Sequence, residues 1–463
     1  MTLPVWLAVL LFVLSAVAVL DRLLLPGVRW WLGRRLQRAV DELNRRLHLR
    51  LDPFKTTRRE VLVDRLAHDP KVLEAVEAQA RETRTPRDVL LARVRRYAGE
   101  IVPSFSAYAY FRAGYWVARS VAKFLYRVRI GYADDDGLSR IPRDASVVFV
   151  MNHRSNMDYV LVAYLAADRT ALSYAVGEWA RIWPLQTLIR AMGAYFVRRN
   201  SNDALYRRVL ERWVQIAAEA GVVQAIFPEG GLTRDGTLGP PRLGLLGYML
   251  RPFDARAERD VVFVPVGINY DRVFEDRTQL LAADPEARRP GFAGAVAGAG
   301  AFVLRNLKLL VMGRWYRFGY ACVNFGTPLS LRAWCRERGV EFRGLDADAR
   351  MARIGEFGSE VMRRVGTYVP VTPVALVASA LASDVDRVWS GVELRAAASA
   401  RQRELEASGA HVYVPRDDHD YAIAVGLRML VLRRVVEEVG DGFRVRDGER
   451  RLLEYYANSV AHL

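Results

Sequence analysis

Residues 147–159 read VVFVMNHRSNMDY, and this stretch decides the fold class. The apolar, β-branched run at its start predicts a buried strand, and a polar motif follows that strand directly. A segment at 204–220 has helical periodicity, with Ser201 or Asp203 as a plausible N-cap. Strands that alternate with helices predict an α/β sheet flanked by helices. Four further strand-like runs lie at 171–176, 194–197, 222–227 and 261–268.

His153 and Asp158 are the candidate catalytic pair in this first motif. On a regular helix, side chains five residues apart point about 140° away from each other, so His153 and Asp158 can meet only under one condition. His153 has to lie in the turn after the strand, and Asp158 in the first turns of the following helix. Asp158 can then fix the imidazole tautomer and leave the other nitrogen as a general base. The alternative is a helix-capping loop whose histidine is simply satisfied.

Three more polar motifs follow predicted strands or lie within one, as expected for sites at the carboxyl ends of strands. GAYFVRR at 193–199 ends in two arginines that suit a phosphate, or are solvated charges. FPEGGLTR at 227–234 has paired glycines that let the backbone approach a ligand, or form a plain turn. VPVGINYDRV at 264–273 places Pro265 inside an apolar strand, which marks an edge, a bulge or a site.

The composition of the 463-residue chain indicates two or three folded units and an anionic partner. Its 68 Lys plus Arg against 52 Asp plus Glu give a net charge of +16. That excess suits nucleic acid, an anionic membrane or a phosphorylated substrate. The two cysteines, Cys322 and Cys335, form no CxxC pair, which favours a reducing compartment and no structural metal.

The first residues predict a membrane anchor, which we assign to 1–32. Residues 3–20 are uncharged and apolar, close to the ~20 residues that span a bilayer. No Lys or Arg precedes the run, as a cleaved signal peptide would require, although a cleaved signal or an apolar hairpin stays an alternative. Arginines follow it from Arg22 onward, so the positive-inside rule keeps the rest of the chain cytoplasmic.

Three regions follow the anchor. Residues 33–135 are predicted to be helical, 136–335 to form the catalytic domain, and 336–463 to be mostly helical with a short hairpin near 442–445. Residues 105–130 are predicted to form one helix with a basic stripe. This helix is either a core helix with one solvated side or an interfacial helix on anionic lipid. The stripe consists of Arg112, Arg119, Lys123 and Arg127.

Taken together, the four motifs in this order resemble the glycerolipid acyltransferase superfamily. They correspond to its HxxxxD, GxxFxRR-type, (F/V)xEG and proline-strand motifs. The wording HRSNMDY is similar to that of the bacterial membrane-bound glycerol-3-phosphate acyltransferases, and the similarity extends over roughly residues 90–463. It includes RRYAGEI at 95–101, VNFGTPL at 323–329 and YYANS at 455–459. The resemblance implies the mixed sheet flanked by helices of this superfamily.

The resemblance implies transfer of a fatty acyl group from acyl-CoA or acyl carrier protein to the 1-hydroxyl of glycerol 3-phosphate. The product is lysophosphatidate, in the first step of phospholipid synthesis. His153 would be the general base, Asp158 would orient it, and Pro265 matches a position on the acyl-donor side. This chain has Leu232 where close relatives have a polar residue, which leaves the acceptor open. The substrate-binding candidates are Arg154, Ser155, Gly193, Phe196, Arg198, Arg199, Glu229, Gly230, Gly231, Thr233, Arg234 and Pro265.

The chemistry expected from these residues needs no cofactor and no metal. A thioester is already activated, and backbone amides near the glycine loop or at the helix start after Met151 could hold the oxyanion. The chain has no GxSxG elbow of a serine hydrolase, and only one of its six histidines lies in the motif region. The expected localisation is the inner or plasma membrane, with anionic lipid as a partner.

Two alternatives stay open on the sequence. One is a lysophosphatidate acyltransferase, and the other is a non-catalytic, membrane-tethered binder of lipid or acyl carrier protein. Nucleic acid is not expected, because the basic residues are spread along the chain and match no reader motif. Acyl-chain length, CoA or carrier protein as donor, and oligomeric state are not determined by the sequence.

Overall fold

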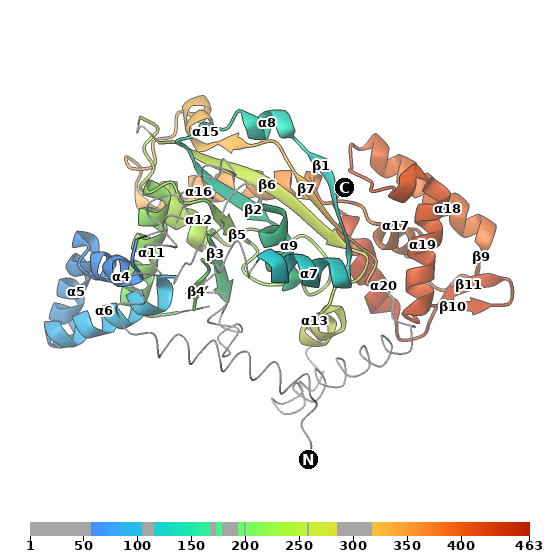
Figure 1. Cartoon of the computed structure of the whole chain (residues 1–463), viewed down its shortest axis with the longest axis horizontal. Helices are drawn as coiled ribbons and strands as arrows, with labels where there is room; N and C mark the ends of the chain where they lie inside the picture. The colour runs from blue at the N-terminus through green and yellow to red at the C-terminus, as the bar shows by residue number, and fades with distance from the viewer. Residues whose placement is uncertain are drawn as a thin grey trace, which may run out of the picture. The chain divides into compact units, whose positions relative to one another are not determined.

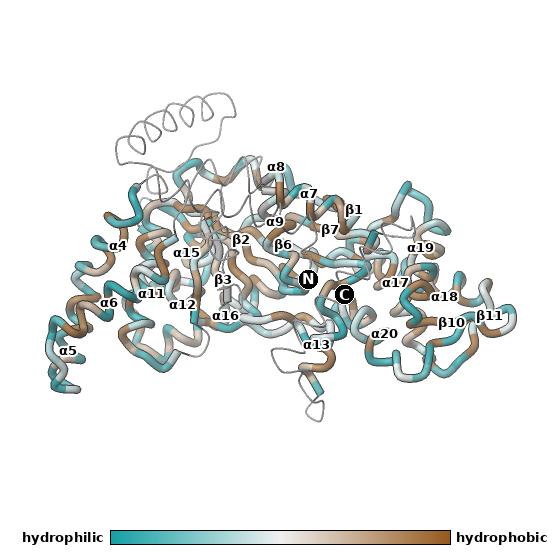
Figure 2. Tube along the Cα trace, turned by 60° about the horizontal axis from the view of Figure 1, so that its bottom comes forward, coloured by the Kyte–Doolittle hydropathy of each residue, from teal (hydrophilic) through white to brown (hydrophobic). Residues whose placement is uncertain are grey.

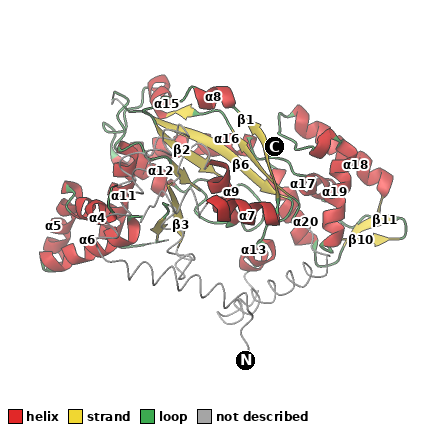
Figure 3. Ribbon diagram, viewed as in Figure 1, coloured by secondary structure: helices red, strands yellow, loops and turns green. Residues whose placement is uncertain are grey.

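The structure is a computed structural model that describes residues 57–103, 115–166, 173–177, 193–198, 201–256, 259–284 and 317–463. The predicted anchor at 1–32 lies outside the described residues, as does the start of the predicted helical region. Among the helices that are described, none has the length and apolar character needed to cross a bilayer. Figure 3 shows the helices in red and the strands in yellow; along the sequence, the first four described elements are helices, and the longer strands come after them.

The chain divides into two compact units, which are described separately. The first comprises the described parts of Met1–Trp116 and Ala166–Trp213. It contains three helices, a pair of parallel strands and the first part of a fourth helix that continues beyond Trp213. These elements are α4 (Arg59–Ala67), α5 (Pro70–Thr83), α6 (Arg87–Ile101), β3 (Ser173–Gly177), β4 (Tyr195–Val197) and α11 (Ala204–Glu219).

The second unit, Val117–Leu165 and Val214–Leu463, contains a mixed sheet in the order β1-β7-β6-β2-β5, with β8 beside β6 (Figure 1). The pairs β1–β7, β6–β2 and β2–β5 are parallel, whereas β6 is antiparallel to both β7 and β8. The predicted mixed α/β sheet is therefore confirmed. Its strands are β1 (Arg127–Ala133), β2 (Ser146–Met151), β5 (Gln224–Ile226), β6 (Val261–Tyr270), β7 (Tyr320–Phe325) and β8 (Leu329–Ser330).

Helices of the second unit pack against this sheet and cover hydrophobic strands. All ten residues of β6 are buried, and β2 and β6 are mainly brown in Figure 2. The long helix α16 packs against β6 and β2 and continues the core on that side. The helices before the C-terminal region are α7 (Tyr115–Leu125), α8 (Asp135–Ser139), α9 (Met157–Ala166), α12 (Leu243–Leu250), α13 (Asp276–Ala283), α15 (Leu331–Arg338) and α16 (Ala347–Thr367).

Pro265 lies in a central strand and not at an edge. The ladder from β6 to β8 ends at Phe263, and the ladder from β6 to β7 begins at Val266. The proline therefore falls where β6 changes antiparallel partners, so its missing N–H breaks no ladder. Its carbonyl still accepts a hydrogen bond from the Gly326 amide at 2.8 Å.

The prediction of one helix over 105–130 is wrong at its C-terminal end. Helix α7 ends at Leu125, and β1 begins at Arg127, which pairs with Tyr320 of β7. Arg127 therefore leaves the predicted basic stripe, and Arg112 lies outside the described residues. Pairing with a strand about 190 residues away in the sequence overrides the local helical periodicity.

The C-terminal region is joined to the sheet through a buried carboxylate. Asp271, directly after β6, accepts hydrogen bonds from the backbone amides of Tyr320 (2.7 Å) and Val374 (3.0 Å). Burial raises the pKa of Asp271 to about 6. The predicted hairpin near 442–445 is present as β10–β11. The region contains α17 (Pro373–Leu381), α18 (Gly391–Ala407), α19 (His419–Leu432), α20 (Arg450–Ala457), β9 (Trp389–Ser390), β10 (Val436–Val439) and β11 (Gly442–Val445).

Candidate active site

His153 and Asp158 meet across the turn between β2 and α9. The strand ends at Met151, His153 lies in the turn, and Asp158 is the second residue of the helix. Nδ1 of His153 lies 2.9 Å from Oδ2 of Asp158, and both side chains are buried, with 2% and 0% exposure. This is the strand–turn–helix geometry that the five-residue spacing required.

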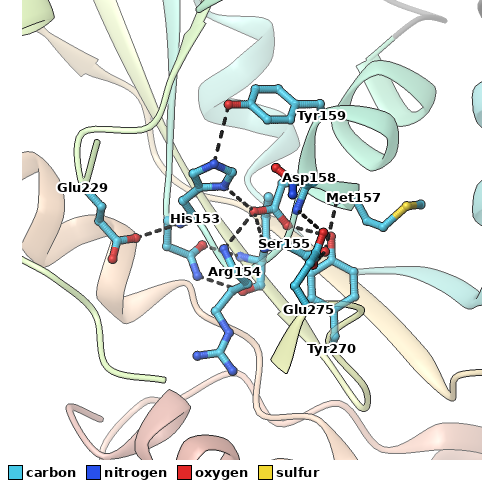
Figure 4. A network of polar contacts seen from close by, with 12 residues as sticks. His153, Arg154, Ser155, Met157, Asp158, Tyr159, Glu229, Tyr270 and Glu275 are labelled. Carbon is cyan, nitrogen blue, oxygen red and sulfur yellow. Dashed lines mark hydrogen bonds and ion pairs between the residues drawn. The ribbon is translucent and has the colours of Figure 1, made fainter. Parts of the chain in front are cut away.

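Four donors converge on the Asp158 carboxylate (Figure 4). Oδ2 accepts from His153 Nδ1 and from the backbone amides of Arg154 (2.8 Å) and Ser155 (3.0 Å). Oδ1 accepts from the Tyr270 hydroxyl at 2.6 Å. Because a carboxylate so placed only accepts, Nδ1 of His153 carries the proton and Nε2 is left with its lone pair.

Aromatic rings surround the imidazole. Phe227 stacks on His153 with ring centroids 4.2 Å apart, and Tyr159 packs edge-on against both rings. The Tyr159 hydroxyl lies 3.5 Å from Nε2 of His153, at the limit of a hydrogen bond. The rings of Phe227 and Tyr159 therefore flank the imidazole, and the Tyr159 hydroxyl lies near its basic nitrogen.

Two further carboxylates hold the turn that carries His153. Glu229 accepts from the His153 amide at 2.7 Å and from the Gly239 amide at 2.9 Å, and burial raises the pKa of Glu229. Glu275 accepts from the Ser155 hydroxyl at 2.7 Å and from the Asn156 amide at 3.2 Å. Burial also raises the pKa of Glu275. These carboxylates bind backbone and side-chain donors of the protein itself.

Ser155 and Arg154, both expected to bind substrate, have partners inside the protein. Ser155 is fully buried and donates its hydroxyl to Glu275. The Arg154 side chain points away from the His153 ring (Figure 4). Its guanidinium lies 4.8 Å from the ring centroid of Tyr455 on α20 and donates to the Gly236 carbonyl. We infer that these two side chains anchor the turn from behind, where the C-terminal region packs.

The glycine loop after β5 contacts the turn that carries His153 through a backbone hydrogen bond. The amide of Thr233 donates to the His153 carbonyl at 3.1 Å, and the Thr233 side chain closes the turn by bonding to the Thr237 carbonyl. Gly230 has φ = +69°, the left-handed region that favours glycine. Arg234 is exposed and makes no hydrogen bond to any described residue. It is therefore accessible to an anion.

The amides at the helix start do not serve as oxyanion donors, contrary to the sequence-based expectation. Every backbone amide from His153 to Asp158 already donates within the protein, to Glu229, Asp158, Glu275 or Ser155. Within the described residues, the amides of Gly231 and Leu232 in the glycine loop make no hydrogen bond. They are the remaining candidates from the original expectation.

The second motif lies in the first unit. Gly193 has φ = +87° and accepts from the Ser173 hydroxyl at 3.0 Å, and the Phe196 ring is fully buried. Arg198 follows β4 and forms a bidentate ion pair with Glu100 of α6. Arg199 lies outside the described residues. The first and third motifs thus meet around His153. The second motif belongs to the first unit and is described by itself.

Three residues near the dyad were missed by the sequence reasoning: Tyr159, Tyr270 and Glu275. Tyr159 belongs to the quoted motif, and the other two lie in or just after the proline-strand motif, in NYDRVFE at 269–275. Polar residues directly after a buried strand were the available signal. The partners of Tyr270 and Glu275 lie more than 100 residues away in the sequence, so these two contacts could not be predicted from it.

Tyr270→Phe is expected to lower kcat about ten-fold with little change in KM. A hydrogen bond to a charged group contributes about 1.5–3 kcal/mol, part of which stabilises the dyad when His153 becomes charged. Burial and the Asp158 charge raise the pKa of Tyr270, which keeps the phenol a donor. Steady-state kinetics test this. Tyr126→Phe is the matched control, because the equally buried Tyr126 donates to the Arg272 carbonyl. An equal loss in both variants would contradict the assignment.

Two family models match the chain. The acyltransferase family model matches residues 134–269, which include the dyad and the glycine loop. The model of the glycerol-3-phosphate acyltransferase C-terminal region matches residues 307–463. The chain thus contains an acyltransferase domain followed by a region that matches the glycerol-3-phosphate acyltransferase C-terminal region. Tyr455, which packs behind the catalytic turn, lies in the second matched region.

Curated glycerol-3-phosphate acyltransferases are similar over nearly the whole chain. Glycerol-3-phosphate acyltransferases of Xylella fastidiosa and Pseudomonas putida are 27% and 28% identical over 93% and 88% of the chain. These alignments cover 50% and 49% of the relatives, so the chain spans about half the length of the curated relatives it matches. A solved 1-acyl-sn-glycerophosphate acyltransferase from Thermotoga maritima overlaps with 55% of this chain and 78% of its own, at 16% identity and a TM-score of 0.31.

No group of three or more His, Cys, Asp or Glu side chains is placed to hold a metal ion within the described ranges. His419, the first residue of α19, lies beside the Gln402 amide. His411 stacks on Tyr132, with ring centroids 4.4 Å apart.

Proposed function

We propose that the chain transfers a fatty acyl group from a thioester to the 1-hydroxyl of glycerol 3-phosphate. The observation that carries this proposal is the buried His153–Asp158 pair, which leaves Nε2 of His153 as a base. Similarity to the C-terminal region of glycerol-3-phosphate acyltransferases supports the acceptor. Acyl-CoA or acyl carrier protein is proposed as the donor, because both present the acyl group as a thioester.

The proposed reaction is a direct transfer. Nε2 of His153 takes the proton of the acceptor hydroxyl as its oxygen attacks the thioester carbonyl. The tetrahedral oxyanion is stabilised by hydrogen-bond donors, for which the amides of Gly231 and Leu232 are proposed. Collapse breaks the carbon–sulfur bond, and the thiolate takes the proton from His153. Asp158 stabilises the imidazolium between these two proton transfers.

A competition between acceptors tests this function. The purified chain in detergent would receive one acyl-CoA, or acyl carrier protein in a parallel series, with equal amounts of glycerol 3-phosphate, lysophosphatidate and dihydroxyacetone phosphate. We expect lysophosphatidate to be the dominant product. If phosphatidate were the dominant product, the preferred acceptor would be lysophosphatidate and not glycerol 3-phosphate. Thiol release without any acylated product would exclude the transferase.

We also propose that the chain works at an anionic membrane, anchored by residues 1–32 with its catalytic unit on the cytoplasmic side. Helix α7 supports this proposal. It buries Ala118 and Ala122 and exposes an apolar face in which Trp116 is 67% and Phe124 47% exposed. Arg119 is exposed beside this face, as is Lys123, and such cations attract anionic headgroups.

An environment-sensitive fluorophore tests this contact in the full chain reconstituted into vesicles. A label on Trp116→Cys is expected to shift to the blue with phosphatidylglycerol but not with phosphatidylcholine, and Arg119→Glu is expected to weaken the shift. A label on Val392→Cys is the control, because Val392 is 80% exposed on α18. The native cysteines are buried. Equal shifts at both sites, or none, would contradict the α7 contact.

A further inference from the structure

A cavity of about 440 Å³ lies in the second unit, outside the catalytic turn. Its walls come from β1, from β7, from Pro370 and from the segment 411–419. None of its described lining residues belongs to the catalytic turn or to the glycine loop. Ligand sites have volumes of about 300–1,000 Å³, so this cavity has room for a small organic molecule. We call it the aromatic cavity, after its lining residues Tyr132, His411 and Tyr413.

Hydrogen bonds hold both sides of the aromatic cavity in place. On one side, the Val371 amide donates to the His411 carbonyl at 2.9 Å, and the Tyr413 amide donates to the Val371 carbonyl at 3.0 Å. On the other side, the fully buried side chain of Asn324 accepts from the Tyr132 amide at 2.8 Å. Because the walls are fixed in this way, the binding of a ligand costs little reorganisation.

The aromatic rings of the cavity are neutral. His411 stacks on Tyr132, with ring centroids 4.4 Å apart, and both rings lie nearly parallel to the ring of Tyr368. The Tyr413 ring lies 5.1 Å from that of Tyr320. Burial lowers the pKa of His411, so its imidazole is mostly uncharged at neutral pH. The faces of neutral aromatic rings have a negative potential, which attracts cations.

Asp417 gives the aromatic cavity its negative charge. It is the one carboxylate among the described residues that line the cavity, and no described lysine or arginine lines it. The Asp417 carboxylate makes no hydrogen bond or ion pair within the described ranges. In a chain with a net charge of +16, a cavity with this lining disfavours phosphate and favours a cation.

Two arginines adjoin lining residues in the sequence without lining the cavity themselves. Arg416 lies 4.3 Å from the ring centroid of Tyr421. Arg129 donates to the Val128 carbonyl at 2.9 Å. Burial raises the pKa of Tyr413, and Arg129 opposes this rise, so Arg129 lies close to the Tyr413 hydroxyl. The guanidinium groups thus contact tyrosines beside the cavity, and Asp417 remains the charged group of the cavity itself.

The segment that carries Asp417 is strained. Arg416 has φ = +63° and Asp417 has φ = +53°, so two successive residues other than glycine adopt the left-handed region. This conformation is costly for such residues and persists only where the surrounding structure determines it. Strain of this kind often collects at ligand sites. Here it fixes the backbone that presents Asp417 at the cavity.

We propose that the aromatic cavity binds a small organic cation that carries a primary ammonium group. Such a group has three N–H donors. The acceptors are the Asp417 carboxylate, the Tyr132 hydroxyl and a ring nitrogen of His411, none of which has a hydrogen-bond partner in the described part of the chain. The rings add cation–π attraction. The site takes no part in the proposed acyl transfer, and its ligand is a free aliphatic amine or the amine headgroup of a lipid.

Calorimetric titration of the full chain in detergent tests the site. Putrescine is the probe for a free amine, and ethanolamine is the probe for a lipid headgroup. We expect saturable binding of at least one amine, with one ligand per chain, and the amine that binds more tightly identifies the source. Butanediol has the same chain length as putrescine and no charge, so it is expected not to bind. No saturable binding of either amine, or equally tight binding of butanediol, would overturn the proposal.

Asp417→Asn removes the charge and keeps the size of the side chain. Asparagine readily adopts the left-handed conformation, so the backbone of the segment is expected to stay as it is. We expect the Kd of the bound amine to rise at least about ten-fold, because a charge-assisted hydrogen bond is lost. Tyr132→Phe keeps the ring, removes one acceptor and is expected to raise the Kd by a smaller factor. An unchanged Kd in both variants would overturn the proposal.

Asp420→Asn is the matched control. Asp420 lies three residues further along the chain, is 72% exposed in its side chain and lies 3.9 Å from Arg395. Its substitution removes the same charge and is expected to leave the Kd unchanged. An equal rise of the Kd in Asp417→Asn and Asp420→Asn would reduce the effect to general surface charge and overturn the proposal. Acyl transfer measured without amine is expected to be the same in Asp417→Asn and wild type, so the amine site and the proposed function are tested separately.

Discussion

Replacing His153 with alanine is expected to lower kcat by about 10²–10⁴-fold, the usual contribution of a positioned general base. Nε2 of the imidazole lies 3.5 Å from the Tyr159 hydroxyl, and the Phe227 ring stacks on the imidazole. Without it, the acceptor hydroxyl has to lose its proton to water. Initial rates of acylated product, measured with saturating glycerol 3-phosphate and acyl donor, give kcat for both proteins.

The control for this variant is His411→Ala. His411 is a partly buried histidine that stacks on Tyr132 and takes no part in the proposed reaction. Its substitution is expected to leave kcat within about two-fold. Melting temperatures of both variants show whether they are folded. If folded His153→Ala kept kcat within a few-fold of the wild type, the general-base role would be wrong.

Asp158→Asn is expected to lower kcat by at least about 10²-fold while the turn stays folded. An asparagine can place its carbonyl oxygen where Oδ2 accepts three donors, and its amide group toward Tyr270, whose hydroxyl can turn to accept. The hydrogen bonds of the turn are then kept. What is lost is the negative charge that stabilises the imidazolium of His153.

Asp158→Ala separates the effect of the lost charge from the effect of the lost hydrogen bonds. It removes the acceptor of four donors and leaves the buried amides of Arg154 and Ser155 unsatisfied. Each unsatisfied group costs about 1–3 kcal/mol, so a clearly lower melting temperature is expected than for Asp158→Asn. If Asp158→Asn were nearly as active as the wild type, the charge of Asp158 would be irrelevant and the carboxylate only structural.

The sequence was sufficient to predict the local geometry of the dyad. The apolar run predicted a strand that ends at Met151, and the spacing placed His153 in the following turn and Asp158 in the first turns of a helix, which the structure begins at Met157. Tyr270 and Glu275 could be found only from the fold. They reach the turn because β6 lies next to β2 in the sheet, and that neighbourhood depends on pairing between segments more than 100 residues apart.

Other differences between the local pattern and the structure have the same physical origin. β1 has the composition of a helix continuation, and only its pairing with β7 makes it a strand. Pro265 marks an edge, a bulge or a site when seen alone, and the gap between two antiparallel partners accommodates it in a central strand. Ser155 is the kind of residue that binds substrate, but its hydroxyl is donated to Glu275. Long-range contacts decide each of these cases.

The most direct test of the account is the initial rate of labelled lysophosphatidate formation from labelled glycerol 3-phosphate by the purified chain. It would be measured with acyl-CoA and with acyl carrier protein, for the wild type and for His153→Ala. The account predicts steady formation with at least one donor, and its near-complete loss in folded His153→Ala. No product from either donor with folded wild-type protein, or equal rates for both proteins, would contradict the account.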